Sequence, residues 1–151
     1  MALSGEYEPS PVPWVRDEVE LIERTGTAVG GRPVVVLTTV GARSGKLRKT
    51  PLMRVELRGS YAVVASMNGA DRHPQWYANV LAHPEVELLD GDRLLQLVAR
   101  EVTGAERARW WSTACHVFPG YVDYQSRTRR RIPLLVLDPP GGGGGVVGPA
   151  P

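Results

Sequence analysis

The chain has 151 residues, which is enough for one domain with a substantial core. Its formal net charge is only +2, with a pI near 8.9, so its overall charge does not drive binding to nucleic acid or to a membrane. The single cysteine, Cys115, excludes an internal disulfide and a multi-cysteine metal site, and no apolar run approaches the roughly 20 residues that span a bilayer. We therefore expect a soluble, cytoplasmic protein.

The N-terminal quarter begins with an acidic, proline-containing stretch, residues 1–12, which predicts a flexible arm. Residues 13–25 then place apolar side chains such as Trp14 and Ile22 near helical spacing, and Gly26 provides a stop. We favour a short amphipathic helix that covers an open sheet edge. Weak contact with the inner membrane face is the alternative, although the acidic residues of the helix would repel anionic lipid.

A strand over residues 33–40, a glycine-containing loop and a second strand over residues 49–57 follow. Arg43, Lys46, Arg48 and Lys49 lie within seven positions, and no acidic residue occurs between positions 38 and 54. Arginine and lysine together suit an elongated anion that carries phosphates or carboxylates. The spacing does not match a nucleotide-binding P-loop, so ATP and GTP are excluded. A solvated basic hairpin loop is the alternative reading of this pattern.

The rest of the chain predicts short strands in hairpins with helices between them. The expected strands are 61–66, 86–89, 94–102 and 132–137, and the expected helices are 75–82, 104–116 and a turn or two over 121–126. Thr103 and Glu106 form the pattern of a capping box. About six strands without a repeated βαβ rhythm predict an antiparallel barrel with inserted helices, of α+β or mainly β class. The domain covers residues 13–138, and the Gly- and Pro-rich tail 139–151 is expected to be disordered.

Few patterns in this chain carry chemistry of their own. The three histidines lack the spacing of metal ligands, so we expect no metal site. The arginine run 127–131 has no interleaved aromatic residues, so we expect no nucleic-acid partner. Tyr121 and Tyr124 are three positions apart and share a helical face, which is consistent with core packing or with closure over a flat substrate.

Four segments resemble the deazaflavin-dependent nitroreductase family of actinobacteria, which uses coenzyme F420. They are residues 34–52, residues 64–66 with 73–79, residues 118–126 and residues 131–133. The resemblance implies a split β-barrel related to the flavin-reductase-like, FMN-binding proteins. It also implies hydride transfer from reduced F420 to a quinone, nitroaromatic or other conjugated acceptor.

The same resemblance implies which residues hold the coenzyme and the acceptor. The basic loop would bind the phosphate and oligoglutamate tail through Ala42, Arg43, Ser44, Lys46, Arg48 and Lys49. The deazaflavin ring would be lined by Thr50, Pro51, Leu52, Met53, Val64, Ala65, Ser66, Met67, Gln75, Trp76, Tyr77, Ala78, Asn79 and Tyr121. Tyr121, Tyr124 and Ser66 would act on the acceptor. An FMN enzyme on the same barrel, a non-catalytic F420-binding protein and a homodimer are alternatives that the sequence leaves open.

Overall fold

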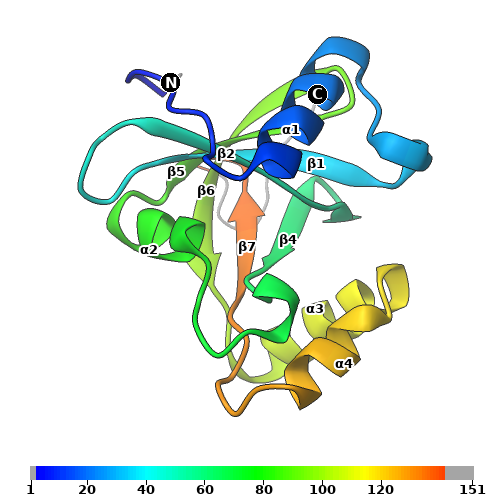
Figure 1. Cartoon of the computed structure of the whole chain (residues 1–151). Helices are drawn as coiled ribbons and strands as arrows, with labels where there is room; N and C mark the ends of the chain where they lie inside the picture. The colour runs from blue at the N-terminus through cyan, green and yellow to red at the C-terminus, as the bar shows by residue number, and fades with distance from the viewer. Residues whose placement is uncertain (1–2, 142–151) are drawn as a thin grey trace.

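The computed structural model describes residues 3–141, and most of the expected C-terminal tail lies outside this range. Within it, seven antiparallel strands form one curled sheet in the order β2-β1-β5-β6-β7-β4-β3 (Figure 1). The strands are β1 Val34–Val40, β2 Leu47–Met53, β3 Val55–Leu57, β4 Ser60–Val64, β5 Glu85–Asp90, β6 Arg93–Glu101 and β7 Leu134–Asp138. The predicted split β-barrel fold is confirmed.

The sheet curls because one continuous segment supplies both of its outer strands. β2 pairs with β1 and β3 pairs with β4, and only Arg54 separates β2 from β3. The Arg54 side chain donates from Nε to Asp90 Oδ1 at 2.9 Å, and Tyr61 donates to Asp90 Oδ2 at 2.5 Å. The expected single strand over residues 49–57 is therefore wrong, because Arg54 turns the chain from one end of the sheet to the other. This division accounts for seven strands instead of six.

The helices lie where the sequence predicted them. They are α1 Pro13–Thr25, α2 Gln75–Ala82, α3 Gly104–Val117 and α4 Gly120–Ser126, with short 3₁₀ turns η1 Val29–Gly31 and η2 Met67–Gly69. The predicted capping box is wrong, since Thr103 makes no side-chain cap. Both Glu106 carboxylate oxygens instead accept from Arg100, at 2.9 and 2.8 Å.

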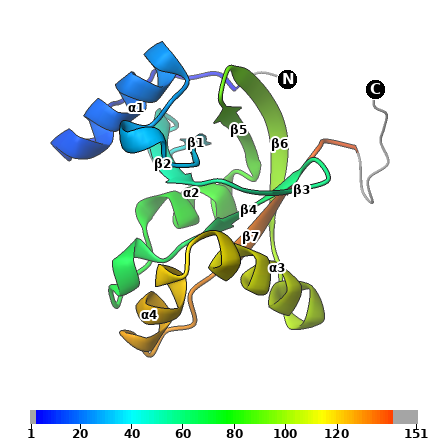
Figure 2. The same cartoon turned by 90° about the vertical axis from the view of Figure 1, so that its right-hand side faces the viewer.

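Hydrophobic side chains on both faces of β4 and β7 are buried, because the curled sheet encloses one face together with α2, and α3 and α4 cover the other. On one face Val63 and Leu135 pack with Val80 of α2, and on the other face Val64 and Leu134 join a cluster with α3 and α4. Successive strand residues point to opposite faces. Because both faces are buried, the sequences of β4 and β7 are continuously apolar and do not alternate with polar residues. In both views α1 lies at one end of the molecule, and α3 and α4 lie together at the other (Figures 1 and 2).

The N-terminal arm is attached to the outer strand β2. Tyr7 forms a parallel bridge with Leu47, through hydrogen bonds from Glu8 N to Leu47 O at 2.9 Å and from Leu47 N to Glu6 O at 2.8 Å. The helix α1 packs nearby, and its Val19 and Ile22 are buried in one cluster with Val36 of β1. The arm and α1 therefore cover the strand that carries Arg48 and Lys49. The division of the chain into arm, domain and tail stays a prediction.

Candidate functional site

A cleft of about 530 Å³ opens between β2, the start of α1, the η2 loop, α2 and α4. Its volume is typical of sites for small molecules and cofactors. Of the expected site residues it is lined by Arg48, Lys49, Thr50, Pro51, Leu52, Met53, Val64, Ser66, Met67, Gln75, Trp76, Asn79, Tyr121 and Tyr124. Segments far apart in the sequence thus meet around one cavity.

One end of the cleft is cationic. Arg48 and Lys49 lie on β2 at this end, whereas Arg32 lies near the other end of β2, because Val34 pairs with Met53 and Arg54 N donates to Pro33 O at 2.8 Å. Each cation has an acidic partner from the N-terminal region: Arg48 contacts Glu8 at 3.3 Å, Arg32 contacts Glu18 at 2.6 Å, and Lys49 binds Glu23. Sequence reasoning missed these acids because they lie 14 to 40 positions away from the cations that they neutralise.

The other end is aromatic. Tyr121 of α4 is 5% exposed, and its ring packs edge-on against Phe118, with 5.0 Å between the centroids. The Tyr124 ring is 6.3 Å from Tyr121. Burial, with smaller contributions from Tyr124 and Cys115, raises the pKa of the Tyr121 phenol well above its ordinary value. The hydroxyl therefore stays protonated and is a hydrogen-bond donor at every physiological pH.

Tyr121 is one of the residues that line the cleft. Among residues 3–141 its hydroxyl has no protein hydrogen-bond partner, yet no fully buried polar side-chain atom in this range is left unpaired. The hydroxyl therefore keeps some exposure to solvent. Met53 packs beside the same aromatic group and lies five residues from Arg48 on β2, or about 16 Å along an extended strand. The cationic end and the aromatic end are therefore far enough apart to contact the two ends of one elongated ligand.

A strained loop, residues 65–70, forms one wall of the cleft between β4 and α2. Met67 and Asn68 have φ of 47° and 56°, in the left-handed region that side chains other than glycine rarely adopt. Such residues cost about 1–3 kcal/mol each and persist only where the surroundings enforce them. Gly69, with φ of 80°, lies so close to α4 that an added Cβ would be 2.7 Å from Tyr124 O. The loop and α4 thus form one packed unit.

Asn79 of α2 connects the helix to the start of the basic loop. Its side chain is 1% exposed. Its Oδ1 accepts from Ala42 N at 3.0 Å, and its Nδ2 donates to Thr39 Oγ1 at 3.1 Å. The amide therefore holds the end of β1 and the beginning of the loop against α2.

The tip of the basic loop lies outside the cleft. Gly41 N donates to Lys46 O at 2.8 Å, and Ser44 Oγ accepts from Lys46 N at 3.1 Å, so the loop closes on itself. Seven expected site residues do not line the cavity: Ala42, Arg43, Ser44, Lys46, Ala65, Tyr77 and Ala78. Their roles stay predictions. Tyr77 donates to Glu101 Oε1 at 2.5 Å, and Arg43 and Lys46 have no ion-pair partner within residues 3–141.

Several lining residues were not expected from the sequence. They are Ser10, Val12, Trp14, Val15, Glu18, Arg32, Val34, Asn68, Pro74 and Phe118. Trp14, which the sequence placed among the apolar residues of the helix, is 61% exposed here. The others have no local pattern that distinguishes them from ordinary loop or strand residues.

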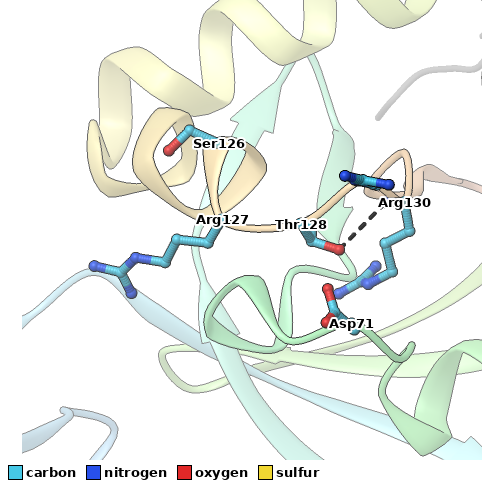
Figure 3. Close-up of a pocket in the computed structure, with 6 residues that line it drawn as sticks. Asp71, Ser126, Arg127, Thr128 and Arg130 are labelled. Atoms are coloured by element: carbon cyan, nitrogen blue, oxygen red, sulfur yellow. Dashed lines mark hydrogen bonds between the residues drawn. The ribbon is translucent and has the colours of Figure 1, made fainter.

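A second hollow of about 510 Å³ lies on the outer side of the 65–70 loop (Figure 3). It is open and polar, and it is lined by Asp71, Ser126, Arg127, Thr128, Arg129 and Arg130. It lacks the apolar walls that hold a flat ligand, so we assign the site to the first cleft. In the part of the chain that the structure describes, no group of His, Cys, Asp or Glu side chains is arranged to hold a metal ion.

Comparison with known families shows which family the chain belongs to. Residues 14–139 match the family described as F420H(2)-dependent quinone reductase. The chain belongs to this family. A curated family member from Mycobacterium tuberculosis (strain H37Rv), named F420H(2)-dependent quinone reductase, is 36% identical over 111 residues, which are 72% of this chain and 74% of that protein. The resemblance to an F420-dependent family is thereby confirmed.

Solved structures place this quinone reductase family member on the same fold. A structure described as F420-H2 dependent reductase (FDR-A) has a TM-score of 0.68 and 50% identity, over 71% of this chain and 95% of that one. A structure described as a domain-swapped dimer has a TM-score of 0.70 and 47% identity, over 85% and 100%. A haem-binding protein from Mycobacterium smegmatis, 16% identical with a TM-score of 0.56 over 76% and 49% of the two chains, shares the fold alone.

Proposed function

We propose that this chain is an oxidoreductase that transfers a hydride from reduced coenzyme F420 to a quinone. The observation that carries the proposal is a single cleft with cations at one end and aromatic side chains at the other, in a chain that belongs to the F420H(2)-dependent quinone reductase family. Nitroaromatic and other conjugated acceptors are a further proposal, since they share the flat, electron-poor ring of a quinone.

The residues present fit the coenzyme. Its oligoglutamate and phosphate tail needs cations, and Arg48 and Lys49 supply them at one end of the cleft. Its flat head needs apolar walls, and Met53, Val64 and Trp76 supply these further in. Arg43 and Lys46, which lie outside the cleft on the same hairpin, extend the cationic surface for the distal part of the tail.

The protein contributes positioning and a proton donor. When bound, reduced F420 supplies the hydride from its ring. The apolar wall around Met53 and Val64 excludes water and fixes the plane in which a flat molecule lies. The accessible, protonated Tyr121 hydroxyl lies where it can donate to an acceptor oxygen that gains negative charge. Because Tyr124 and Phe118 hold the Tyr121 ring, the position of its hydroxyl oxygen is fixed before the substrate arrives.

Two measurements test the proposal. Titration of F420 with the protein should change the coenzyme fluorescence in a saturable manner, and F420H2 should be oxidised at a rate that depends on added menadione. Arg48→Ala should weaken coenzyme binding about tenfold and reduce its salt dependence, because one cation is removed from the contact with the tail. An unchanged dissociation constant would refute the tail site, and absence of binding by the unmodified protein would refute the function.

Two alternatives are separated by the same reagents. FMN on the same barrel would give a coloured protein as purified and tighter binding of FMN than of F420. A non-catalytic F420-binding protein would bind the coenzyme but would not oxidise F420H2 when menadione is added. Either result would replace the hydride-transfer assignment.

We also propose a homodimer, a cytoplasmic location and weak membrane contact as finer features. The dimer is supported by the similar structure described as a domain-swapped dimer, and light scattering after gel filtration tests it. Membrane contact would involve Trp14 and Val12, which are exposed at the cleft mouth. No helix among residues 3–141 is long and apolar enough to cross a membrane. Co-sedimentation with vesicles of neutral and of anionic lipid tests the contact.

A further inference from the structure

The arginine run after α4 contains one member that differs from its neighbours. Arg130 is partly buried and reaches across to the 65–70 loop, whereas Arg129 and Arg131 are exposed. The Arg130 guanidinium donates from Nε to Ala70 O at 2.7 Å, from Nη1 to Ala65 O at 3.2 Å and from Nη2 to Ser66 O at 2.7 Å. Nη1 is also 3.0 Å from His73 Nδ1. One side chain thus binds both ends of the strained loop.

Arg130 lies on the side of this loop that faces away from the cleft. Figure 3 shows its side chain extending from the segment after α4 toward Asp71, in the outer hollow. Ser66, Met67 and Asn68 line the cleft on the opposite side, and Arg130 does not. The guanidinium therefore acts on the wall of the site from behind, without touching a ligand.

The orientation of the peptide groups follows from these contacts. All peptide bonds in the described residues are trans, so each N–H points opposite to the C=O of its own peptide unit. Because the carbonyls of Ala65 and Ser66 point at Arg130, the N–H groups of Ser66 and Met67 point away from it, toward the cleft side. Neither N–H has a protein partner within residues 3–141, although the neighbouring Ala65 N and Gly69 N do.

The backbone angles make these N–H groups converge. Ser66 is right-handed, with φ of −79° and ψ of −38°, and Met67 is left-handed, with φ of 47°. This pair of conformations turns successive N–H groups into one concavity that binds an anion or a partly negative oxygen. A cation on the two carbonyls also polarises their peptide units, which makes each N–H a stronger donor.

We propose that Arg130 is a positioning residue for hydride transfer: it holds and polarises the 65–70 loop so that the Ser66 and Met67 N–H groups donate to a carbonyl oxygen in the cleft. The proposal rests on the proposed function. The oxygen belongs either to the coenzyme ring or to the acceptor, and both carry the same carbonyl chemistry.

The test compares Arg130→Gln and Arg130→Lys with the control Arg129→Gln, which removes the same charge from the same segment. Arg129 makes no side-chain hydrogen bond within residues 3–141 and lies outside the cleft. We expect Arg130→Gln to lower kcat/KM at least tenfold, Arg130→Lys to recover part of the loss, and Arg129→Gln to stay within twofold of the unmodified protein. A rise in the coenzyme Kd assigns the oxygen to the coenzyme ring, whereas a fall in kcat at unchanged Kd assigns it to the acceptor.

A spectroscopic measurement separates this role from a merely structural one. In the unmodified protein the amide-proton resonances of Ser66 and Met67 should move downfield when F420 and a quinone analogue are added, and this shift should be lost in Arg130→Gln. Equal kcat/KM and Kd for Arg130→Gln and Arg129→Gln would overturn the proposal. The proposal would also be overturned if Arg130→Gln lost activity only because its Tm is lower, while the folded fraction turned over at the normal rate. Failure of the proposed function is distinct, because the unmodified protein would then neither bind nor oxidise F420H2.

Discussion

At the residue scale, the proposed function gives the hydroxyl of Tyr121 the role of proton donor. This group is protonated and accessible, while its ring is held by Phe118 and Tyr124. Tyr121→Phe keeps the ring packing and removes only the donor, so we predict a fall in turnover of about tenfold or more with less than threefold change in coenzyme Kd. Steady-state rates with menadione and a fluorescence titration check this. Equal losses in both quantities would place the hydroxyl on the coenzyme side.

Asn79 has a structural role that can be measured separately. Asn79→Ala leaves Ala42 N and Thr39 Oγ1 without their buried partner, and each such group costs about 1–3 kcal/mol. We predict a loss of about 2 kcal/mol in the free energy of unfolding, measured by urea denaturation. Gln75→Ala, which removes only a longer contact of 3.3 Å to the same amide, serves as the matched control and should cost less. A loss below 0.5 kcal/mol, on the order of a surface substitution, would contradict the bracing role.

At the scale of elements, the arm and α1 would compete with an anionic ligand for the cations of β2. Glu8 and Glu23 neutralise Arg48 and Lys49, so an anionic tail must displace them. Exposed ion pairs contribute about 0–1 kcal/mol each, so Glu8→Gln with Glu23→Gln should tighten F420 binding roughly twofold to fivefold. Isothermal titration at low and high salt measures this effect, which should shrink as salt rises.

The control for this experiment is Glu20→Gln. Glu20 is exposed on the same helix and has no ion pair among the residues that the structure describes. The substitution Glu20→Gln removes one charge from α1 without freeing a cation, so the affinity for F420 should be nearly unchanged. If Glu20→Gln tightened binding as much as the double variant, the effect would come from net charge and not from the two pairs.

At the scale of the whole molecule, alkaline pH should destabilise the fold. Burial, followed by the Asp90 hydrogen bond, raises the pKa of Tyr61 to about 12, and burial, followed by the Glu101 hydrogen bond, raises that of Tyr77 to about 12. In the unfolded chain both phenols lose their protons near the ordinary value of about 10. The folded state therefore binds more protons between about pH 10 and 12, and the free energy of unfolding falls as pH rises, by about 1.4 kcal/mol per pH unit for each proton difference.

Urea midpoints measured from pH 8 to pH 11.5 check this dependence. The midpoint should be flat below pH 9.5 and should fall above it. Tyr61→Phe and Tyr77→Phe should each reduce the alkaline slope, whatever their effect at pH 8. Identical slopes in the unmodified and substituted proteins would show that other groups control the alkaline transition.

Local sequence patterns were sufficient for the elements of this protein. Local residue patterns predicted α1 and α2 with their observed bounds. These features depend on neighbours within a few positions, so the sequence alone determines them. The paired motifs around residues 34–52 and 73–79 also sufficed to identify the F420-dependent family.

Only the tertiary structure decided which distant groups meet. Arg54 divides one predicted strand between the two ends of the sheet because the barrel must close, and no local pattern marks that position. Glu8 and Glu23 reach Arg48 and Lys49 across 40 and 26 positions, and Arg130 reaches Ser66 across 64. The physical reason is that such contacts arise from chain packing, which places side chains by their position in space and not by their spacing in sequence.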